Sequence, residues 1–483
     1  MWNWIKNFTG SELVIGGLGT FAVLSHLLLI FQLPVHSIIF PICIIIPFII
    51  GIFLWIKRKR IHPITKREKI AFIFSLLILS LIVIALSIGC IKGSGSLPDY
   101  FFSWQLKAIA LGSPATLEKP YFRAPNVVSN IKDYPILQPL ILASSFDLLG
   151  IKYGTLIFPI IYLIMVWVAY NNFRKAGLSI IASHIMMLSL ATTPMLISPG
   201  CGSVDSGYGD FFFTFSLTII GAGLITQSWW LLFWGSLILP LIKPEGMIYG
   251  IILWLSLLFF GRKKEYISGS LGFGLGLCLW VPIWFSLTEI NHKLVLYKFI
   301  IFIGIIFIIG YVFKSFILLL NLNKTKQWIL FIVILGIGFT AVIILKNAFS
   351  NSHSALIEYF VLRLDNIFKN IYLLPKALHY WIFYFSFIRK YSFLYIIIAF
   401  LLLMPKKIAG ECPSYALCSF LIILSITSIL PFLALPTHHV DLHLRSRMDR
   451  LFLHWAGAGW MLLGVWIKPL LLWGEEKIFS KKS

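Results

Sequence analysis

The sequence predicts an all-α protein that crosses the membrane many times. Of its 483 residues, 59% are hydrophobic and only 12% are charged, which is about half the charged share of a soluble domain. Runs of Ile, Leu, Phe and Val long enough to cross a hydrocarbon core of ~30 Å recur along the whole chain. Such runs must be helical in lipid, because each backbone polar group needs an internal partner. We therefore expect one transmembrane domain, residues 1–483.

The apolar runs define the candidate membrane spans. They lie at about 11–33, 35–56, 69–91, 154–172, 178–198, 209–226, 228–243, 245–260, 267–286, 296–313, 327–345, 379–404, 414–435 and 450–468. Several runs between 209 and 260 are short and closely spaced, so we expect about 13–14 transmembrane helices.

Basic loops predict the orientation. The strongest is KRKRIHPITKREK, between the second and third runs, and placing it in the cytoplasm puts the N-terminus there too. The same topology places the basic segments NNFRKAG, GRKKEY, LNLNKTKQ, MPKKIAG and the C-terminal tail in the cytoplasm. The net charge of +22 is therefore explained by topology, and we expect no nucleic-acid partner.

The opposite, outer face has fewer and longer loops. They are residues 92–153, the short PGCGSVDSGYGD, residues 346–378 and residues 436–450. In the first, residues 100–111 look amphipathic and predict a helix lying at the membrane surface. The prolines after Asp133 in KDYPILQPL predict a broken helix that re-enters the membrane.

Placing an acidic side chain near the membrane core costs free energy, so the acids found there are candidates for function. Asp99 lies soon after the third span and precedes Tyr100, and the alternative for Asp99 is a helix N-cap. Asp205 and Asp210 lie in a short Gly-rich loop, where they could hold a metal ion or position a hydroxyl, while Asp210 could also cap the next helix.

Basic residues next to these acids are candidates for phosphate binding. Lys243 and Glu245 lie between two short spans; they could pair with each other, and Lys also suits a phosphate as a compact point charge. Arginines on an outer face run against the usual charge bias, and their guanidinium groups match phosphate oxygens bidentately. The alternative for them is contact with anionic lipid headgroups. The last outer loop contains Arg445, Arg447, Asp449 and Arg450, preceded by possible metal ligands at His438, His439, Asp441 and His443.

These segments, taken in order and on one face, resemble the GT-C glycosyltransferases. The similar pieces are PDYFFSWQLKAIALG, KDYPILQPL, SGYGDFFFTF, LIKPEGMIYG and RSRMDRLFLHW, which touch about two fifths of the chain. Bacterial members similar to the protein O-mannosyltransferases and the lipid A aminoarabinose transferase are nearest. Many members carry two adjacent acids where this chain has Asp99 and Tyr100.

The resemblance implies an inverting transfer of a sugar from a polyprenyl-phosphate carrier to a glycan, lipid or protein acceptor. Asp99 would be the general base, and Lys243, Arg445, Arg447 and Arg450 would hold the leaving phosphate. Asp133, Asp205 and Asp210 would contact the acceptor or a divalent metal ion, which is the only cofactor we consider. The site would face the periplasm or exterior of a bacterial inner membrane, in contact with membrane lipids.

The resemblance also divides the chain. Residues 1–68 form an extra N-terminal helix pair and a basic cytoplasmic loop, residues 69–260 form the catalytic module, and residues 261–483 form variable C-terminal helices.

Three alternatives stay open. A lipid-linked oligosaccharide polymerase or ligase usually has one large late outer loop, and residues 346–378 are a modest one. A transporter or flippase needs ionisable residues within the spans, and His184 and Glu289 are the exceptions there. A membrane scaffold leaves the acids and arginines of the outer face unexplained.

Overall fold

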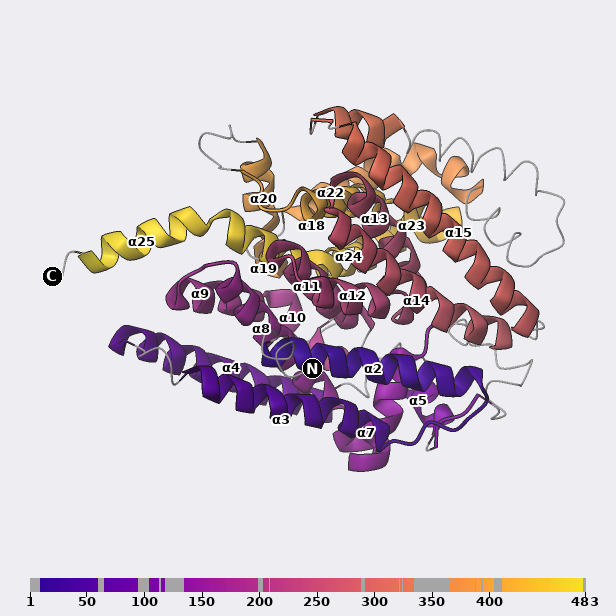
Figure 1. The fold of residues 1–483 in the computed structure, drawn as a ribbon, viewed down its shortest axis with the longest axis horizontal. Helices are drawn as coiled ribbons and strands as arrows, with labels where there is room; N and C mark the ends of the chain where they lie inside the picture. Colours follow the sequence, from indigo (N-terminus) through magenta and orange to yellow (C-terminus); the bar gives the residue numbers. More distant parts are fainter. Residues whose placement is uncertain are drawn as a thin grey trace.

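The computed structural model describes residues 9–59, 65–93, 104–112, 114–117, 134–198, 203–207, 209–287, 292–320, 322–323, 325–333, 365–386, 388–391, 394–403 and 411–480. These residues form helices and no strand; one isolated bridge joins Val35 to Ala115. The predicted all-α, polytopic fold is thereby confirmed (Figure 1).

The first half of the chain supplies the helices around which the rest is packed. They are α2 (Gly10–Ile30), α3 (Ile39–Lys59), α4 (Lys66–Lys92), α5 (Leu106–Leu111), α7 (Leu137–Gly154), α8 (Ile157–Lys175), α9 (Ile180–Ala191), α10 (Pro194–Ile197), η3 (Val204–Ser206), α11 (Gly209–Thr226), α12 (Trp229–Ile238), η4 (Leu239–Leu241) and α13 (Glu245–Phe260).

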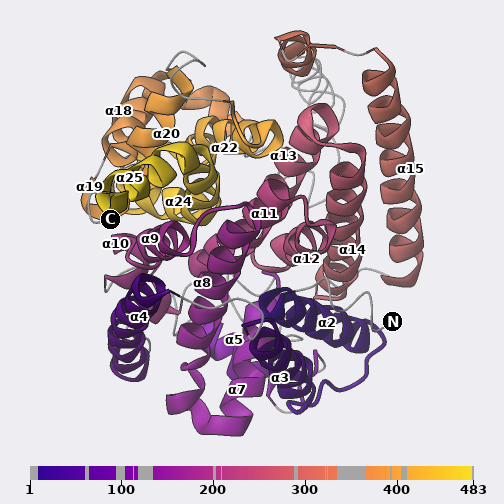
Figure 2. The same cartoon turned by 60° about the vertical axis from the view of Figure 1, so that its left-hand side comes forward.

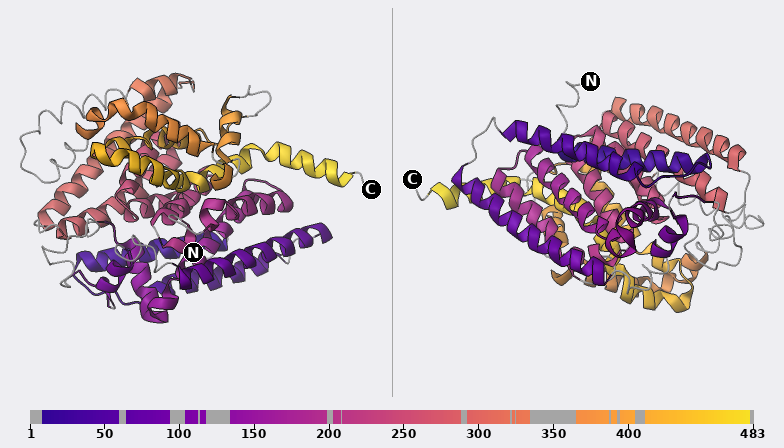
Figure 3. Two further views of the ribbon diagram at one scale, coloured as in Figure 1. Left: turned by 180° about the vertical axis from the view of Figure 1, so that it is seen from behind. Right: turned by 90° about the horizontal axis from the view of Figure 1, so that it is seen from below.

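The second half adds further helices. They are α14 (Lys263–Leu287), α15 (His292–Leu319), η5 (Ile371–Leu373), α18 (Leu374–Phe385), α19 (Ile388–Tyr391), α20 (Leu394–Leu403), α22 (Tyr415–Thr427), α23 (Leu430–Leu433), α24 (Thr437–Trp466) and α25 (Lys468–Ser480). Of these, α14 packs against α12 and α24 against α11. Helix α25 projects away from the bundle, as the views from front and back show (Figures 1 and 3).

The lengths of the helices agree with a membrane protein. Within the described residues six helices are long and apolar enough to cross a membrane, and a seventh span is formed if α24 and α25, bent by 57°, are counted together. A further group of apolar helices is shorter, with 10–17 residues each. The predicted span at 327–345 is described only as far as residue 333, so its second half lies outside the described residues.

Burial distinguishes a central helix from a peripheral one. In the most apolar stretch of α11, 89% of the residues are buried, against 11% in α4. Figure 2 shows α11 in the middle of the bundle, beside α8 and α12, and α4 at its edge. We infer that α4 faces lipid, whereas α11 is enclosed by protein on all sides.

The N-terminal pair α2 and α3 packs by close backbone approach. A Cβ atom on Gly17 would lie 1.9 Å from the carbonyl oxygen of Cys43, and one on Gly51 would lie 2.7 Å from the Cα atom of Gly10. Only glycine fits at such distances. This pair is also tied to the core, because Trp230 of α12 donates a hydrogen bond of 2.8 Å to the carbonyl oxygen of Glu12.

The contacts between loops agree with the predicted topology, because they join loops predicted on the same side of the membrane. Lys175 and Ser228, both at predicted cytoplasmic turns, bind the buried Glu12 at 2.6 and 3.0 Å. At the predicted outer end, Gln138 donates to the carbonyl oxygen of Gly207 at 2.6 Å, and Ser37 bonds to Asp147. The two sets of predicted loops therefore assemble at different ends of the bundle.

Two predicted spans are interrupted. Residues 379–404 were expected to form one helix, but the structure has α18, α19 and α20, and the run is broken near the polar sequence SFIRKYS. The span at 178–198 ends at Ala191 and resumes at Pro194 as α10. Proline lacks the N–H that would continue the helix, which explains the second break.

The last outer loop is a correction to the sequence analysis. Residues 437–449 were expected to be a loop, but they form the first turns of α24. Val440, Leu444 and Met448 recur every four residues and are fully buried. A helix with one apolar stripe explains this burial, and the many polar residues between these positions hide the stripe in the sequence.

The predicted surface helix is present in part, whereas the break expected at the prolines is not: α7 begins after Pro135 and continues through Pro139. Residues 106–111 form α5, in which Leu106 and Ile109 are exposed while Lys107, Ala108 and Leu111 are buried. Helix α7 is interrupted, but at Gly150 (φ 74°) rather than at a proline.

Candidate functional site

The candidate site is built around Asp210, in the first turn of α11. The residue is only 2% exposed, so its carboxylate has little access to water and needs partners within the protein. The sequence allows either a helix cap or a chemical role for this acid. In the structure its carboxylate is the centre of an ionic cluster.

Three basic side chains donate hydrogen bonds to this carboxylate. Lys243 Nζ and His454 Nε2 each lie 2.8 Å from Asp210 Oδ1. Arg450 Nε lies 2.8 Å from Asp210 Oδ2, and Arg450 Nη2 binds the same oxygen. Charge-assisted bonds of this kind are about twice as strong as neutral ones. Both oxygens are therefore engaged by groups far apart in the sequence.

The pairing of α11 with α24 places Arg450 and His454 beside Asp210. These two residues are four positions apart on α24 and so lie on one face of it. Thr214 of α11 donates a hydrogen bond of 2.8 Å to the carbonyl oxygen of Leu453, and a Cβ atom on Gly457 would lie 1.8 Å from Thr218 Oγ1. The two helices are thus in close contact along their length.

Lys243 reaches Asp210 from the turn between η4 and α13, bounded by Pro240 and Pro244. Its side chain is 8% exposed, so the ion pair is shielded from water. The sequence also allowed a pair between Lys243 and Glu245, but Lys243 pairs with Asp210.

Tyr249 extends the cluster by one more hydrogen bond. Its hydroxyl lies 2.8 Å from His454 Nδ1, and both side chains are buried. We call Asp210, Lys243, Arg450, His454 and Tyr249 the Asp210 cluster. It draws on α11, α13 and α24.

Two segments of the predicted outer loop cover this cluster. Lys243 Nζ lies 5.7 Å from the ring centroid of Trp104, a cation–π contact. A Cβ atom on Gly209 would lie 2.7 Å from Lys243 Cε and 3.2 Å from both Gln138 Oε1 and the Trp104 ring. Glycine at position 209 therefore lets the starts of α5 and α7 close over Lys243.

Two buried oxygen atoms near the cluster have no hydrogen-bond partner among the described residues. They are Gln138 Oε1, on a residue that is 1% exposed, and Glu245 Oε2. Buried acceptors of this kind are rare in proteins and usually have a water molecule or ligand as partner. Either could accept a hydrogen bond from a hydroxyl group of a bound molecule.

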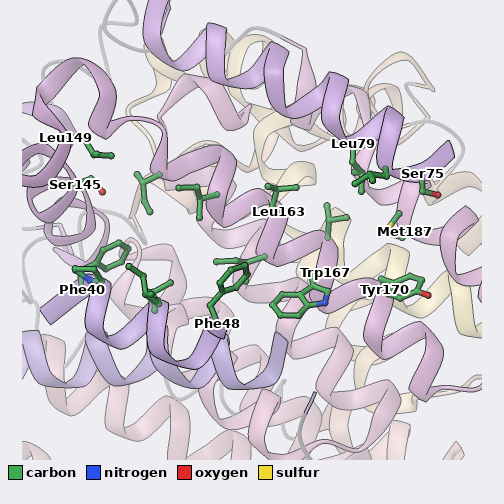
Figure 4. A pocket seen from close by; sticks show the side chains of 18 of the residues that line it. Phe40, Phe48, Ser75, Leu79, Ser145, Leu149, Leu163, Trp167, Tyr170 and Met187 are labelled. Carbon is green, nitrogen blue, oxygen red and sulfur yellow. The ribbon is translucent and has the colours of Figure 1, made fainter. Parts of the chain in front are cut away.

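A long apolar groove starts about two turns of α7 beyond Gln138. It has a volume of about 680 Å³ and lies between α3, α4, α7, α8 and α9. Figure 4 shows Ser145 and Leu149 at one end and Tyr170 and Ser75 at the other. It is lined by α8 from Ile157 to Tyr170, which corresponds to roughly 20 Å along the helix axis.

Asp205 belongs to a different environment from Asp210. It lies in η3, where it accepts a hydrogen bond of 2.5 Å from Ser203 Oγ, and a Cβ atom on Gly89 of α4 would lie 2.5 Å from Asp205 Oδ2. The two acids therefore have separate partners.

The described members of the metal-ligand set that the sequence suggested are not assembled. Among the residues that the structure describes, no three or more His, Cys, Asp or Glu are grouped so as to hold a metal ion. On α24, Asp441 pairs with Lys376 at 2.6 Å, and the rings of His439 and His443 are 6.0 Å apart.

The other candidates are not placed. Asp99, Tyr100, Asp133 and Glu289 lie outside the described residues, and the side chains of His438, Arg445, Arg447 and Asp449 are not described either.

Sequence reasoning missed His454 and Tyr249 of the cluster, and Gln138 beside it. His454 had a signal, since it stands four residues after Arg450 at the helical spacing. Tyr249 and Gln138 had no such signal in the sequence, because a tyrosine or a glutamine at the end of an apolar run is not unusual.

Comparisons with protein-family models, with curated proteins and with solved structures gave no match for this chain. The fold itself defines a class, a polytopic all-α membrane protein with a buried ionic cluster at one end of its helices.

Proposed function

We propose that this protein is a membrane glycosyltransferase that moves a sugar from a polyprenyl-phosphate carrier to an acceptor at the outer face of a bacterial inner membrane. The observation behind the proposal is the convergence of Lys243 and Arg450 on one buried carboxylate. The sequence had selected both residues for binding a phosphate. Held by Asp210, they form a fixed pair of cations.

The chemistry of the donor explains why fixed cations are needed. The bond from the anomeric carbon to the phosphate oxygen breaks, and the phosphate leaves with both bonding electrons. Preorganised positive groups stabilise this developing charge without reorganising during the reaction. A lysine side chain has three N–H donors and an arginine side chain has five. Asp210 accepts only one hydrogen bond from Lys243.

The acceptor hydroxyl forms the new bond to the anomeric carbon and gives up its proton. Asp99 is the base in this proposal, since its role follows from the family resemblance. A positioned carboxylate suffices, because the proton becomes acidic as the oxygen attacks. Glu245 and Gln138 contribute acceptors for sugar hydroxyls in the same region.

The apolar groove provides a place for the carrier lipid. Helix α7 connects the two regions, because Gln138 at its start lies beside Lys243, while Ser145, Leu148 and Leu149 line the groove. Seven residues separate Gln138 from Ser145, or about 10 Å of helix. A phosphate at Lys243 can therefore be continuous with an isoprenoid chain along α8.

The experiment compares two donor classes in membranes from cells that express the protein and from cells that do not. The same labelled sugar is offered on polyprenyl phosphate or on a nucleoside diphosphate. We expect expression to accelerate consumption of the polyprenyl-phosphate donor alone, with release of polyprenyl phosphate. Consumption of the nucleotide sugar instead, or of neither donor above the control membranes, would overturn the proposal.

A further inference from the structure

The Tyr249–His454–Asp210 chain has no part in the reaction as described so far. Tyr249 bonds to His454 Nδ1 and His454 Nε2 bonds to Asp210 Oδ1, each at 2.8 Å. His454 is 1% exposed and Tyr249 is 8% exposed. Because His454 bonds to Asp210 and Tyr249 bonds to His454, the role considered for them acts through Asp210.

The direction of each hydrogen bond follows from the chemistry of the groups. An ionised carboxylate only accepts, so His454 Nε2 must carry the proton that it shares with Asp210. In a neutral imidazole Nδ1 is then an acceptor, and the Tyr249 hydroxyl must donate to it. Tyr249 thereby selects the tautomer and the ring orientation of His454.

The Tyr249–His454–Asp210 hydrogen bonds fix one oxygen of the Asp210 carboxylate, Oδ1. Oδ1 receives His454 and Lys243, while Oδ2 receives Arg450. Without the imidazole, the carboxylate could rotate toward Arg450 or Lys243. The two cations would then no longer be held in fixed positions by one carboxylate. With a neutral imidazole, Asp210, Lys243 and Arg450 together keep one net positive charge.

The Tyr249–His454–Asp210 hydrogen bonds are not the only contacts that join the helices. Helices α11 and α24 already meet at Gly457 and through the bond from Thr214 to Leu453. Replacing buried polar groups by well-packed apolar ones is often neutral or stabilising. A buried carboxylate with three basic partners in a membrane-spanning bundle therefore points to a use other than packing.

We propose that His454 and Tyr249 are positioning residues, which orient Asp210 so that Lys243 and Arg450 present one phosphate-binding pair. This inference rests on the proposed function, since it names the group that the pair binds as the phosphate of the carrier lipid.

The test uses two substitutions of His454 that differ in which nitrogen they imitate. In His454→Gln the longer amide reaches the position of Nε2 and keeps a donor to Asp210. In His454→Asn the shorter amide stays near the position of Nδ1 and loses Asp210. Tyr249→Phe removes only the hydroxyl. Thr214→Val is the control, because it removes a hydrogen bond between the same two helices, and Thr214 contacts only the backbone of Asp210, not a side chain of the cluster.

The readouts are the Kd of each purified full-length protein for polyprenyl phosphate in nanodiscs, and KM and kcat for the polyprenyl-phosphate sugar. We expect His454→Asn to raise Kd and KM about tenfold or more, as loss of outer-shell partners does for bound ions. His454→Gln should stay within about threefold of wild type, and Tyr249→Phe should fall between the two. Thermal unfolding of each variant shows whether the proteins compared are equally folded.

Equal Kd values for His454→Gln and His454→Asn would overturn the positioning role, as would a rise of Kd in Thr214→Val as large as in His454→Asn. If His454→Asn does not fold, Tyr249→Phe decides alone, and an unchanged Kd in it overturns the inference. The proposed function fails separately, if wild-type protein turns over no polyprenyl-phosphate sugar. The predicted differences in Kd among the variants can be observed even if no sugar is transferred. Sugar transfer can likewise be observed even if those differences in Kd are absent.

Discussion

Replacing Asp210 by alanine is expected to be the most damaging single substitution to stability. It leaves Lys243 and Arg450 with side chains 8% and 12% exposed and without their shared anion. Removing one partner of a buried ion pair costs about 3–5 kcal/mol in the free energy of unfolding. Here the two cations would also repel each other. The measurement is thermal or denaturant unfolding of purified protein in detergent.

Asp147→Ala is the matched control for this substitution. Asp147 is an exposed acid of α7, hydrogen-bonded to Ser37, and an exposed substitution of this kind changes stability by about 0.5 kcal/mol or less. If Asp210→Ala were no more destabilising than Asp147→Ala, the cluster would not be the shielded ionic centre that its burial indicates.

The largest effect on activity is expected for Asp99→Asn. Asparagine keeps the shape of the side chain but cannot take the acceptor proton. General-base catalysis contributes about 10²–10⁴-fold, so kcat should fall by that factor. The Kd for polyprenyl phosphate should not change, because the proposal assigns binding of the leaving phosphate to Lys243 and Arg450. Initial rates of polyprenyl phosphate release measure the first quantity and nanodisc binding the second.

Asp147→Asn serves again as the control, since it removes an acid at the same predicted end of the bundle. Full activity in Asp99→Asn would remove this residue as the base. A parallel loss in both variants would point to a general effect of charge at the outer end.

The fold class could be predicted from sequence because the membrane leaves few choices. A chain with 59% hydrophobic residues and no water around its backbone must form helices. Helix ends were harder, since they depend on local interruptions such as Pro194 and on tertiary packing. The first half of α24 shows this, because Val440, Leu444 and Met448 form its buried stripe among charged neighbours.

The candidate site was predicted in part. Asp210, Lys243, Glu245 and Arg450 were selected one by one, because ionisable groups near the membrane core need a reason to be there. Their convergence could not be predicted, since it depends on α24 packing against α11 across more than 200 residues of sequence. His454 was overlooked because it stands inside an apolar run, where a single histidine is more often a packed core residue.

The metal hypothesis illustrates the same limit. His438, His439, Asp441 and His443 are suitable ligands by type, but on α24 Asp441 does not join His439 and His443 in one group. Asp441 turns to Lys376, and none of the described residues completes a group around His439 and His443. Residue types alone could not distinguish this arrangement from a binding site.

The most direct test is the rate at which purified protein in nanodiscs releases polyprenyl phosphate from a labelled polyprenyl-phosphate sugar in the presence of solubilised membrane acceptors. Wild-type protein and Lys243→Met are compared with Lys175→Met, which loses a lysine that pairs with a buried acid at the opposite end of the bundle. We expect release by wild type and by Lys175→Met, and a loss of at least about tenfold in Lys243→Met. Equal release by Lys243→Met and wild type, or no release by wild type, would contradict a phosphate-binding role for the Asp210 cluster in sugar transfer.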